Sequence, residues 1–272
     1  MATLPFPCHA TPLTANGVQN AMAILGIDAA TLWAMLHVET RGCGYFASRR
    51  PQILFERHIF SGPTKGQWNS IAPDVSNPQP GGYGASGDFQ YTRLGKAYSL
   101  DPSAQEAALK SASWGLGQVL GTNASLVGYQ SVEDMVTAMA ASEDQQLDAI
   151  VKFILAKKLQ SALQAQDWAH YAAGYNGPDY AKNHYDTNLS QTYALYQNTS
   201  ALPDLTVRAA QLMLFTLGFN PGGIDGSLGP STLTALHNFQ SQKQISLTTG
   251  IDAAVLAALS AALPGTSNLV LD

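Results

Sequence analysis

Charged residues are scarce in this chain of 272 residues: Asp, Glu, Lys and Arg together make up 12%, about half of the usual ~25%. Basic residues number 14 against 19 acidic ones, for a net charge of -5. That balance argues against nucleic acid as a partner, because such binding depends on neutralising phosphates. The hydrophobic share of 46% is ordinary, which excludes a disordered chain. The surface is therefore built largely from uncharged polar residues and suits an uncharged, hydrogen-bonding ligand.

Long apolar runs and cysteines are also lacking. No stretch approaches the ~18 consecutive apolar residues of a membrane span, so we expect no membrane insertion. Residues 1–16 contain no Lys or Arg, which does not fit a signal peptide and predicts a protein kept in the cytoplasm unless something else releases it. Cys8 and Cys43 are too few for a disulfide framework, and we expect two free thiols. The histidines lack metal-ligand spacing, so we expect no metal and no cofactor.

Apolar residues repeat at helical spacing over most of the chain, so the predicted fold is mainly α. Asp28 is expected to cap a helix that ends near Gly42. Residues 51–95 are rich in Gly and Pro and are expected to form a functional loop. Further helices are expected over Ser103–Ser111, Trp114–Leu120, Val132–Ala140, Glu143–Ala165 and Trp168–Tyr175.

A change in composition divides the chain. Residues 197–205 have the character of a linker, which predicts a first domain over 1–196, a small unit over 206–264 and a tail over 265–272. Three helices are expected in the small unit, over Val207–Leu217, Ser231–Gln240 and Ala253–Leu263.

The small unit carries a specific series of residues: Gln211, Leu217-Gly218, Asp225-Gly226, Gly229-Pro230, Thr232 and Phe239-Gln240. This series resembles the peptidoglycan-binding domain found beside many cell-wall hydrolases, a three-helix module. Most of the matched residues are expected to be scaffold. The wall binding that the resemblance implies is placed first at the loop of Asp225 and Gly226, where the tight turn requires a positive φ.

Glu39 is the candidate general acid. It is expected in the last turn of an apolar helix, followed by Gly42 and Gly44, with Tyr45 and Phe46 beside it. The negative end of the helix dipole and an apolar neighbourhood both disfavour an ionised carboxylate and raise its pKa. A carboxylic acid that stays protonated near neutral pH can protonate the leaving oxygen of a glycoside. The alternative is a surface glutamate without a catalytic role.

Two later segments resemble goose-type lysozymes and soluble lytic transglycosylases. Ser113–Gly121 is similar to their Gly-Leu-Met-Gln segment, and Ala173–Pro178 is similar to their Ala-Tyr-Asn-Gly-Pro segment. Three further stretches are similar to the N-acetylmuramidase family of phage endolysins: Pro51–Phe60, Gly81–Gly84 and Asn176–Tyr180. This resemblance covers about residues 10–196.

The resemblance implies a lysozyme-like catalytic domain in which Glu39 is the general acid. It also implies substrate contacts from four residues: Tyr45, Gln118, Tyr175 and Asn176. Amide groups can donate to and accept from sugar hydroxyl and acetamido groups, and an aromatic face can cover the C–H surface of a pyranose. Trp114, in the same segment as Gln118, is expected in the core.

Glu56 matches a second glutamate of the family motif. The adjacent Arg57 and His58 are expected to keep it ionised, which would give two carboxylates with opposed pKa values and separate acid and base roles. An ion pair of Glu56 with an arginine is an equally open reading. Four arginines near the two glutamates are expected to pair with them or to meet carboxylates of a cell wall: Arg41, Arg49, Arg50 and Arg57.

Taken together, the resemblances imply a monomeric endolysin that cleaves the β-1,4 bond between N-acetylmuramic acid and N-acetylglucosamine in peptidoglycan glycan strands. The enzyme would act in the periplasm after a separate, holin-like pore opens. Three alternatives stay open: a lytic transglycosylase that leaves anhydro-muramyl ends, a non-catalytic wall-binding protein, and a peptidase that uses Cys43 with His37.

Overall fold

The structure is a computed structural model that describes residues 2–40, 42–178, 180–198, 200 and 202–271. The chain divides into two compact units, each assembled from separate stretches of sequence. The first unit comprises Met1–Thr11, Gly44–Phe153 and Thr266–Asp272, and the second comprises Pro12–Cys43 and Ile154–Gly265. These units do not coincide with the expected succession of a domain over 1–196 and a domain over 206–264. The predicted linker includes Thr199 and Ala201, which lie outside the described residues.

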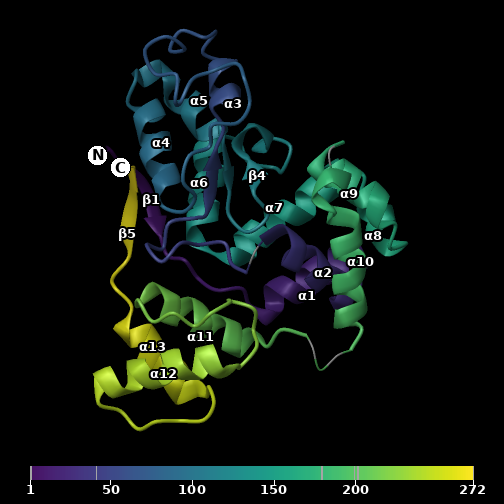
Figure 1. Cartoon of the computed structure of the whole chain (residues 1–272), viewed down its shortest axis with the longest axis vertical. Helices are drawn as coiled ribbons and strands as arrows, with labels where there is room; N and C mark the ends of the chain where they lie inside the picture. Colours follow the sequence, from purple (N-terminus) through teal and green to yellow (C-terminus); the bar gives the residue numbers. More distant parts are fainter. Residues whose placement is uncertain (1, 41, 179, 199, 201, 272) are drawn as a thin grey trace. The chain divides into compact units, whose positions relative to one another are not determined.

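The second unit is entirely helical among its described residues (Figure 1). Its elements are α1 (Ala15–Leu25), α2 (Ala29–Thr40), α8 (Gln160–Gln164), α9 (Trp168–Asn176), the 3-10 helix η3 (Tyr180–Asn183), α10 (Tyr185–Tyr196), α11 (Leu205–Thr216), α12 (Pro230–Lys243) and α13 (Ala253–Ala262). The central helix is α2, in which every side chain from Thr31 to Leu36 is buried. A helix that is buried on all sides forms the middle of a core, and α10 lies along it.

Three helices, α11 to α13, close on a core of their own. Its largest buried members are Leu214, Leu236, Phe239 and Leu259. The expected helices are confirmed to within a few residues, because amphipathic periodicity is a local property of the sequence. The start of α12 differs: Pro230 occupies its first turn and Gly229 is the N-cap, since the fixed φ of proline suits the first helical position.

The first unit combines helices with short strands. Its elements are β1 (Ala2–Cys8), β2 (Ile53–Phe55), α3 (Arg57–Ser61), α4 (Phe89–Tyr98), the 3-10 helix η1 (Pro102–Ala104), α5 (Gln105–Lys110), β3 (Ala112–Trp114), β4 (Val119–Leu120), the 3-10 helix η2 (Gly121–Asn123), α6 (Val132–Ala141), α7 (Glu143–Ala156) and β5 (Ser267–Leu271). The helix α7 continues past Phe153 into the second unit. Strands β2, β3 and β4 form an antiparallel sheet in that order.

Two helix predictions are wrong in this part of the chain. Residues 114–120 form the end of β3, a turn over 115–118 and β4. Gly115 and Gln118 in this turn have φ values of 69° and 48°, which a right-handed helix cannot contain. The helix expected over 143–165 is divided into α7 and α8, and Lys158 between them has a φ of 57°. The expected loop over 51–95 contains β2, α3 and the start of α4.

The C-terminal segment expected to be a tail is a strand. β5 pairs antiparallel with β1, in a register that joins Thr3 to Val270 and Cys8 to Ser267 (Figure 1). Within β5, the side chains of Leu269 and Leu271 are buried. The two ends of the chain thus complete one small sheet, a pairing that no local pattern could indicate.

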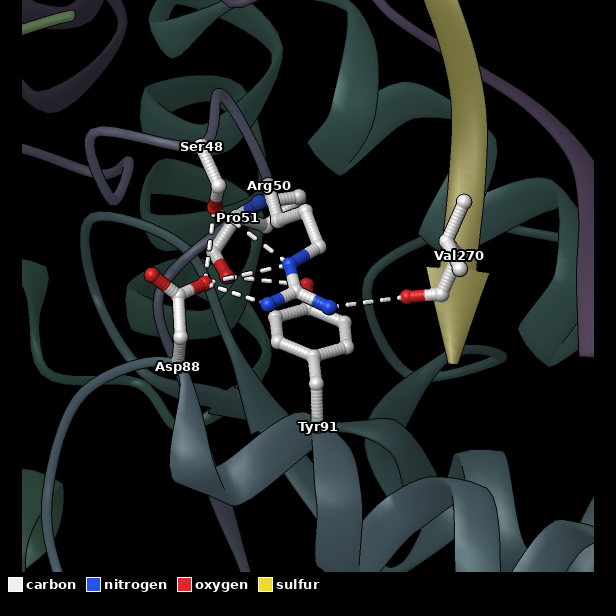
Figure 2. A network of polar contacts seen from close by, with 6 residues as sticks. All are labelled: Ser48, Arg50, Pro51, Asp88, Tyr91 and Val270. Atoms are coloured by element: carbon white, nitrogen blue, oxygen red, sulfur yellow. Dashed lines mark hydrogen bonds and ion pairs between the residues drawn. The ribbon is translucent and has the colours of Figure 1, made fainter. Parts of the chain in front are cut away.

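Arg50 fixes this strand to the rest of the first unit (Figure 2). Its guanidinium donates to the carbonyl oxygen of Val270 at 3.0 Å and to Asp88 Oδ1 at 2.7 and 3.0 Å. It also lies 4.3 Å from the centroid of the Tyr91 ring. The Tyr91 hydroxyl in turn donates to the carbonyl oxygen of Pro51 at 2.9 Å. A cation held over an aromatic face and paired with a carboxylate is a rigid anchor.

Among the described residues, no single helix is long and apolar enough to cross a membrane. α1 and α2 reach the required length and composition only when they are taken together across a bend of 107°. Cys8 and Cys43 are both buried and are not joined in a disulfide.

Candidate active site

The helix α2 brings Glu39 to its last turn, as the sequence predicts. At the other end of α2, Asp28 Oδ1 accepts a hydrogen bond from the backbone N–H of Thr31 at 2.8 Å, which confirms the expected cap. Glu39 itself is partly buried. Beyond the helix, Gly42 has a φ of 116°, a conformation that favours glycine and lets the chain turn away. Arg41 lies outside the described residues.

The surroundings of Glu39 come from α9. The side-chain amide of Asn176 donates to Glu39 Oε1 at 2.9 Å. Tyr171 and Tyr175 lie near the carboxylate as well: burial raises the pKa of both phenols, and the negative charge of Glu39 raises it further. The structure therefore brings together Glu39, Tyr175 and Asn176 within the second unit.

Burial raises the pKa of Glu39 from 4.5 to about 7, and the hydrogen bond from Asn176 partly opposes that rise. The predicted upward shift is thus confirmed in direction. Its cause is removal of the carboxylate from water, which destabilises the charged form. Such a group is a mixture of acid and carboxylate near neutral pH, so it can give up a proton there and recover it.

Tyr171 is a member of this site that sequence reasoning missed. Its ring stacks on that of Tyr175 with the centroids 5.4 Å apart and the planes at 28°. Its hydroxyl is buried and has no hydrogen-bond partner among the described residues. The spacing of four residues between the two tyrosines was the available signal, because residues four apart meet on one face of a helix.

Gln118 belongs to the first unit, in the turn between β3 and β4. Its side-chain amide donates to the carbonyl oxygens of Gly115 at 2.8 Å and Gln52 at 3.2 Å. Both amide protons therefore stabilise the turn, and Oε1 is the atom left to accept from a sugar hydroxyl. Trp114 is fully buried and its indole N–H donates to Leu109 at 3.0 Å, which confirms its expected place in the core.

Glu56 is also in the first unit, at the N-cap of α3, and is partly exposed. His58 Nδ1 lies 3.7 Å from Glu56 Oε2, too far for a hydrogen bond. The Tyr83 phenol is near as well, since its pKa is raised by burial and then by the charge of Glu56. Arg57 instead donates to the backbone carbonyls of Gln79 and Pro73. The ion pair of Glu56 with an arginine, left open by the sequence, is therefore not formed with Arg57.

The other arginines of the expected group also have structural partners. Arg50 pairs with Asp88 at 2.7 Å, and Arg49 donates to the carbonyl oxygen of His9. The sequence could not reveal these partners, because they lie about 40 residues away in the chain.

Tyr45 is not placed as expected. Its side chain is fully buried, and its hydroxyl donates to the carbonyl oxygen of Met139 at 3.0 Å. A residue with no exposed surface cannot contact a sugar, so we assign Tyr45 to the core of the first unit. The tyrosines that lie near Glu39 within the second unit come from α9.

A buried polar pair holds the segments around Tyr45. Glu143 is fully buried and accepts from the backbone N–H of Gly44 at 2.9 Å. Gln146 accepts from Leu116 N at 2.7 Å and donates to the Met139 carbonyl at 2.8 Å. The beginning of the Gly115–Gln118 turn is therefore positioned by α7.

Comparison with known proteins places these features in a family. The sequence profile of the N-acetylmuramidase family matches residues 28–197, well over half of the chain. The chain belongs to the N-acetylmuramidase family. This muramidase also resembles the crystal structure of the endolysin of Burkholderia phage AP3, with 36% sequence identity and a TM-score of 0.63. The likeness covers 70% of this chain and 72% of the endolysin chain. The search of curated proteins finds no match.

A second profile, that of a peptidoglycan-binding domain, matches residues 204–259 of the muramidase. The expected lysozyme-like fold with a helical binding domain is thereby confirmed, and so is the assignment as a peptidoglycan glycosidase.

The loop proposed for wall binding is held from within this domain. The Gln211 amide donates to Asp225 Oδ1 at 2.9 Å, and its oxygen accepts from Gly226 N at 2.8 Å. Gly226 has a φ of 76°, which confirms the predicted turn. Its carbonyl oxygen accepts from Asp204 N at 3.1 Å. Gly226 is buried whereas Asp225 is exposed, so Asp225 is the accessible residue of this pair.

The peptidoglycan-binding domain also touches the segment that follows Glu39. The buried Arg208 of α11 donates to the carbonyl oxygen of Gly42 at 2.7 Å. Ile224 lies close to Gly42, within 3.6 Å of the position of an added Cβ. The segment that follows α2 is therefore supported by residues that are more than 160 positions later in the chain.

Among the described residues, no group of three or more His, Cys, Asp or Glu side chains is arranged to hold a metal ion. Cys43 is buried, and His37 Nδ1 is 2.9 Å from the Tyr196 hydroxyl. These placements give the peptidase alternative no support.

Proposed function

We propose that this muramidase is an endolysin that cleaves the β-1,4 bond between N-acetylmuramic acid and N-acetylglucosamine, with Glu39 as the general acid. The observation that carries the proposal is the buried carboxyl group of Glu39, with a pKa of about 7 and the Asn176 amide on its Oε1. A carboxyl group that is half protonated at neutral pH supplies the proton that an alkoxide leaving group requires.

The proposed reaction begins when Glu39 transfers its proton to the glycosidic oxygen. The bond from this oxygen to the muramyl C1 breaks, its electron pair stays on the oxygen, and C1 gains oxocarbenium character. Water then adds to C1 and loses a proton to a base, for which we propose Glu56. Its partial exposure and the absence of an Arg57 ion pair support that choice. Solvent returns a proton to Glu39.

We propose sugar contacts from Tyr175, Asn176 and Gln118. Tyr175 presents an aromatic ring next to Glu39, which can cover a pyranose face. Asn176 donates one amide proton to Glu39. Its second amide proton and its oxygen are left to bond with a sugar. Gln118 retains Oε1.

We also propose that function divides the chain at residues 197–205, with catalysis in 1–196 and wall binding in 206–264. The two family profiles, which match 28–197 and 204–259, support this division. Wall binding would begin at the exposed Asp225. The likeness to the AP3 phage endolysin supports a role in host lysis, for which we propose that a separate membrane pore protein gives a monomeric enzyme access to the periplasm.

The test is product analysis of digested peptidoglycan by mass spectrometry. The wild type is expected to release fragments with reducing muramic acid ends that have gained one water. Glu39→Gln is expected to lose activity by about 10²–10⁴-fold, the usual contribution of a general acid. The exposed Glu106 supplies a matched control, since Glu106→Gln removes a carboxylate elsewhere and should retain activity.

Anhydro-muramyl ends in this digest would assign the enzyme as a lytic transglycosylase instead. New peptide amino groups with intact glycan would identify a peptidase. Full activity of Glu39→Gln would refute the general acid, and full activity of Glu56→Gln would refute the proposed base.

A further inference from the structure

A glycine-rich loop of the first unit, residues 79–85, is bonded to the chain on both sides of Glu56. On one side, the backbone N–H of Phe55 donates to Gln90 Oε1 at 3.0 Å. The amide of the same Gln90 donates to the carbonyl oxygen of Tyr83 at 2.8 Å and to a second carbonyl oxygen of the loop at 2.7 Å. Gln90 is buried, so these three hydrogen bonds hold the glycine-rich loop against the end of β2.

Arg57, on the other side of Glu56, makes the second attachment. Its guanidinium donates at 3.2 Å to the carbonyl oxygen of Gln79, the first residue of the glycine-rich loop. It also lies against Gly82, where an added Cβ would be 2.7 Å from Arg57 Cζ. Because Gly82 has a φ of 66°, a side chain at this position would strain the backbone as well as displace the guanidinium. The two residues that flank Glu56 in the chain therefore both take part in fixing the loop.

These attachments bring the phenol of Tyr83 to the carboxylate of Glu56. The pKa of this phenol is raised by burial, then by the charge of Glu56, and also by a side-chain hydrogen bond with Glu56. The positive charge of Arg57 opposes the rise, and Arg93 is a second cation near the phenol. A phenol with a raised pKa is neutral near pH 7, so its O–H is the donor and the carboxylate accepts.

A carboxylate that acts as a base must keep one oxygen directed at the water from which it takes a proton. Glu56 is the N-cap of α3, but its side chain makes no capping hydrogen bond. His58 Nδ1 is 3.7 Å from Glu56 Oε2, too far for a hydrogen bond, and Arg57 bonds to backbone carbonyls. Tyr83 is the neighbour whose O–H can hold one oxygen of Glu56 and leave the other for the proton of water.

We propose that Tyr83 is a positioning residue of the muramidase, whose phenol O–H orients the Glu56 carboxylate toward the attacking water. In this step an O–H bond of the water breaks, the water oxygen bonds to the muramyl C1, and the proton goes to the second oxygen of Glu56. Tyr83 keeps its own proton throughout. The inference rests on the proposed function, because it takes Glu56 as the base.

The first test is the kinetics of Tyr83→Phe, which removes the hydroxyl and keeps the ring. We expect kcat to fall about tenfold or more with KM unchanged, because a hydrogen bond to a charged group is lost and no substrate contact is removed. In a Glu56→Gln background the same substitution should cost nothing further, since Tyr83 acts through Glu56. The matched control is Tyr98→Phe, at a partly buried tyrosine of α4, which should keep full activity.

The second test measures the contact without catalysis. Tyrosines labelled with carbon-13 at Cζ are followed by NMR during a pH titration of the full chain, and the Tyr83 resonance is the one that Tyr83→Phe lacks. Glu56→Gln removes the charge that helps to raise the pKa of the Tyr83 phenol, so Tyr83 should titrate at lower pH in this variant. Glu106→Gln, at an exposed glutamate elsewhere in the first unit, should leave the titration in place.

An unmoved titration of Tyr83 in Glu56→Gln would overturn the inference. So would full activity of Tyr83→Phe when Glu56→Gln is inactive, and so would a loss confined to KM, which would make Tyr83 a sugar contact. Full activity of Glu56→Gln would instead refute the proposed base, whereas the titration would still report the contact between Tyr83 and Glu56. The two failures are therefore distinguishable.

Discussion

At the scale of single residues, the protonation of Glu39 depends on two opposed effects. Burial raises its pKa to about 7, and the Asn176 amide, which favours the charged form, lowers it. The general acid must carry its proton to act. Activity is therefore expected to fall as the pH rises through about 7. In a profile of kcat/KM measured between pH 5 and 9, this fall is the alkaline limb.

Asn176→Ala is expected to move that alkaline limb to higher pH, because the hydrogen bond that favours the carboxylate is lost. The same variant should also lower kcat/KM through the missing sugar contact, so the position of the limb is the decisive quantity. Asn238→Ala, an exposed position of α12, serves as the control and should leave the limb in place. A limb that moves to lower pH would contradict the role given to Asn176.

The raised pKa of Glu39 also has a consequence for stability. The carboxyl group is more basic in the folded chain, so the stability due to its proton is complete below pH 4.5 and is lost as the pH rises through about 7. Glu39→Gln does not titrate and escapes this loss. The unfolding free energy of the variant minus that of the wild type is therefore expected to increase by about 3 kcal/mol from pH 4 to pH 8. Urea unfolding at the two pH values measures this gain, and equal differences at both would contradict the raised pKa.

At the scale of elements, tight turns fix the backbone in the segments that carry the family motifs. Gly226 is one such turn: an added Cβ would lie 2.7 Å from Pro203 Cβ and 2.8 Å from Asp204 N, and its φ is positive. Gly226→Ala is expected to destabilise the peptidoglycan-binding domain by about 2 kcal/mol or more, measured by urea unfolding. Gly250→Ala is the control, because a Cβ there meets nothing within 4 Å. Similar losses from both substitutions would show that the turn is not constrained.

The hairpin that carries Gln118 shows where sequence patterns failed. The short apolar run from Trp114 to Leu120 suits a helix or a strand equally. Its conformation is decided by the antiparallel pairing of β2 with β3, and by the contact of Leu116 with Gln146 of α7. These partners lie too far away in the chain to leave a periodic signal. The motif was therefore recognised while its secondary structure was predicted wrongly.

At the scale of the whole molecule, the ends of the chain complete the first unit. Leu269 and Leu271 of β5 are almost fully buried, so Leu269→Ala and Leu271→Ala are each expected to cost about 2–5 kcal/mol of unfolding free energy. Asn268→Ala, at the exposed position that precedes Leu269 in the same strand, should cost little. Thermal unfolding compares the variants, and hydrogen exchange of β1 amides should quicken with the loss of β5. Unchanged exchange in β1 would contradict the pairing.

The sequence by itself determined the predominance of helices, the three-helix peptidoglycan-binding domain, and the place of Glu39 at the end of a buried helix. These follow from periodicity, caps and glycines, which act over a few residues, and from motifs that are contiguous in the chain. Tertiary structure alone decided that Tyr171 and Tyr175 lie near Glu39, that Tyr45 is buried in the core of the first unit, and that Arg57 bonds to backbone carbonyls and not to Glu56. It also decided that β1 meets β5. The reason is physical: these neighbours are set by packing between residues far apart in the chain, and such packing has no local signature.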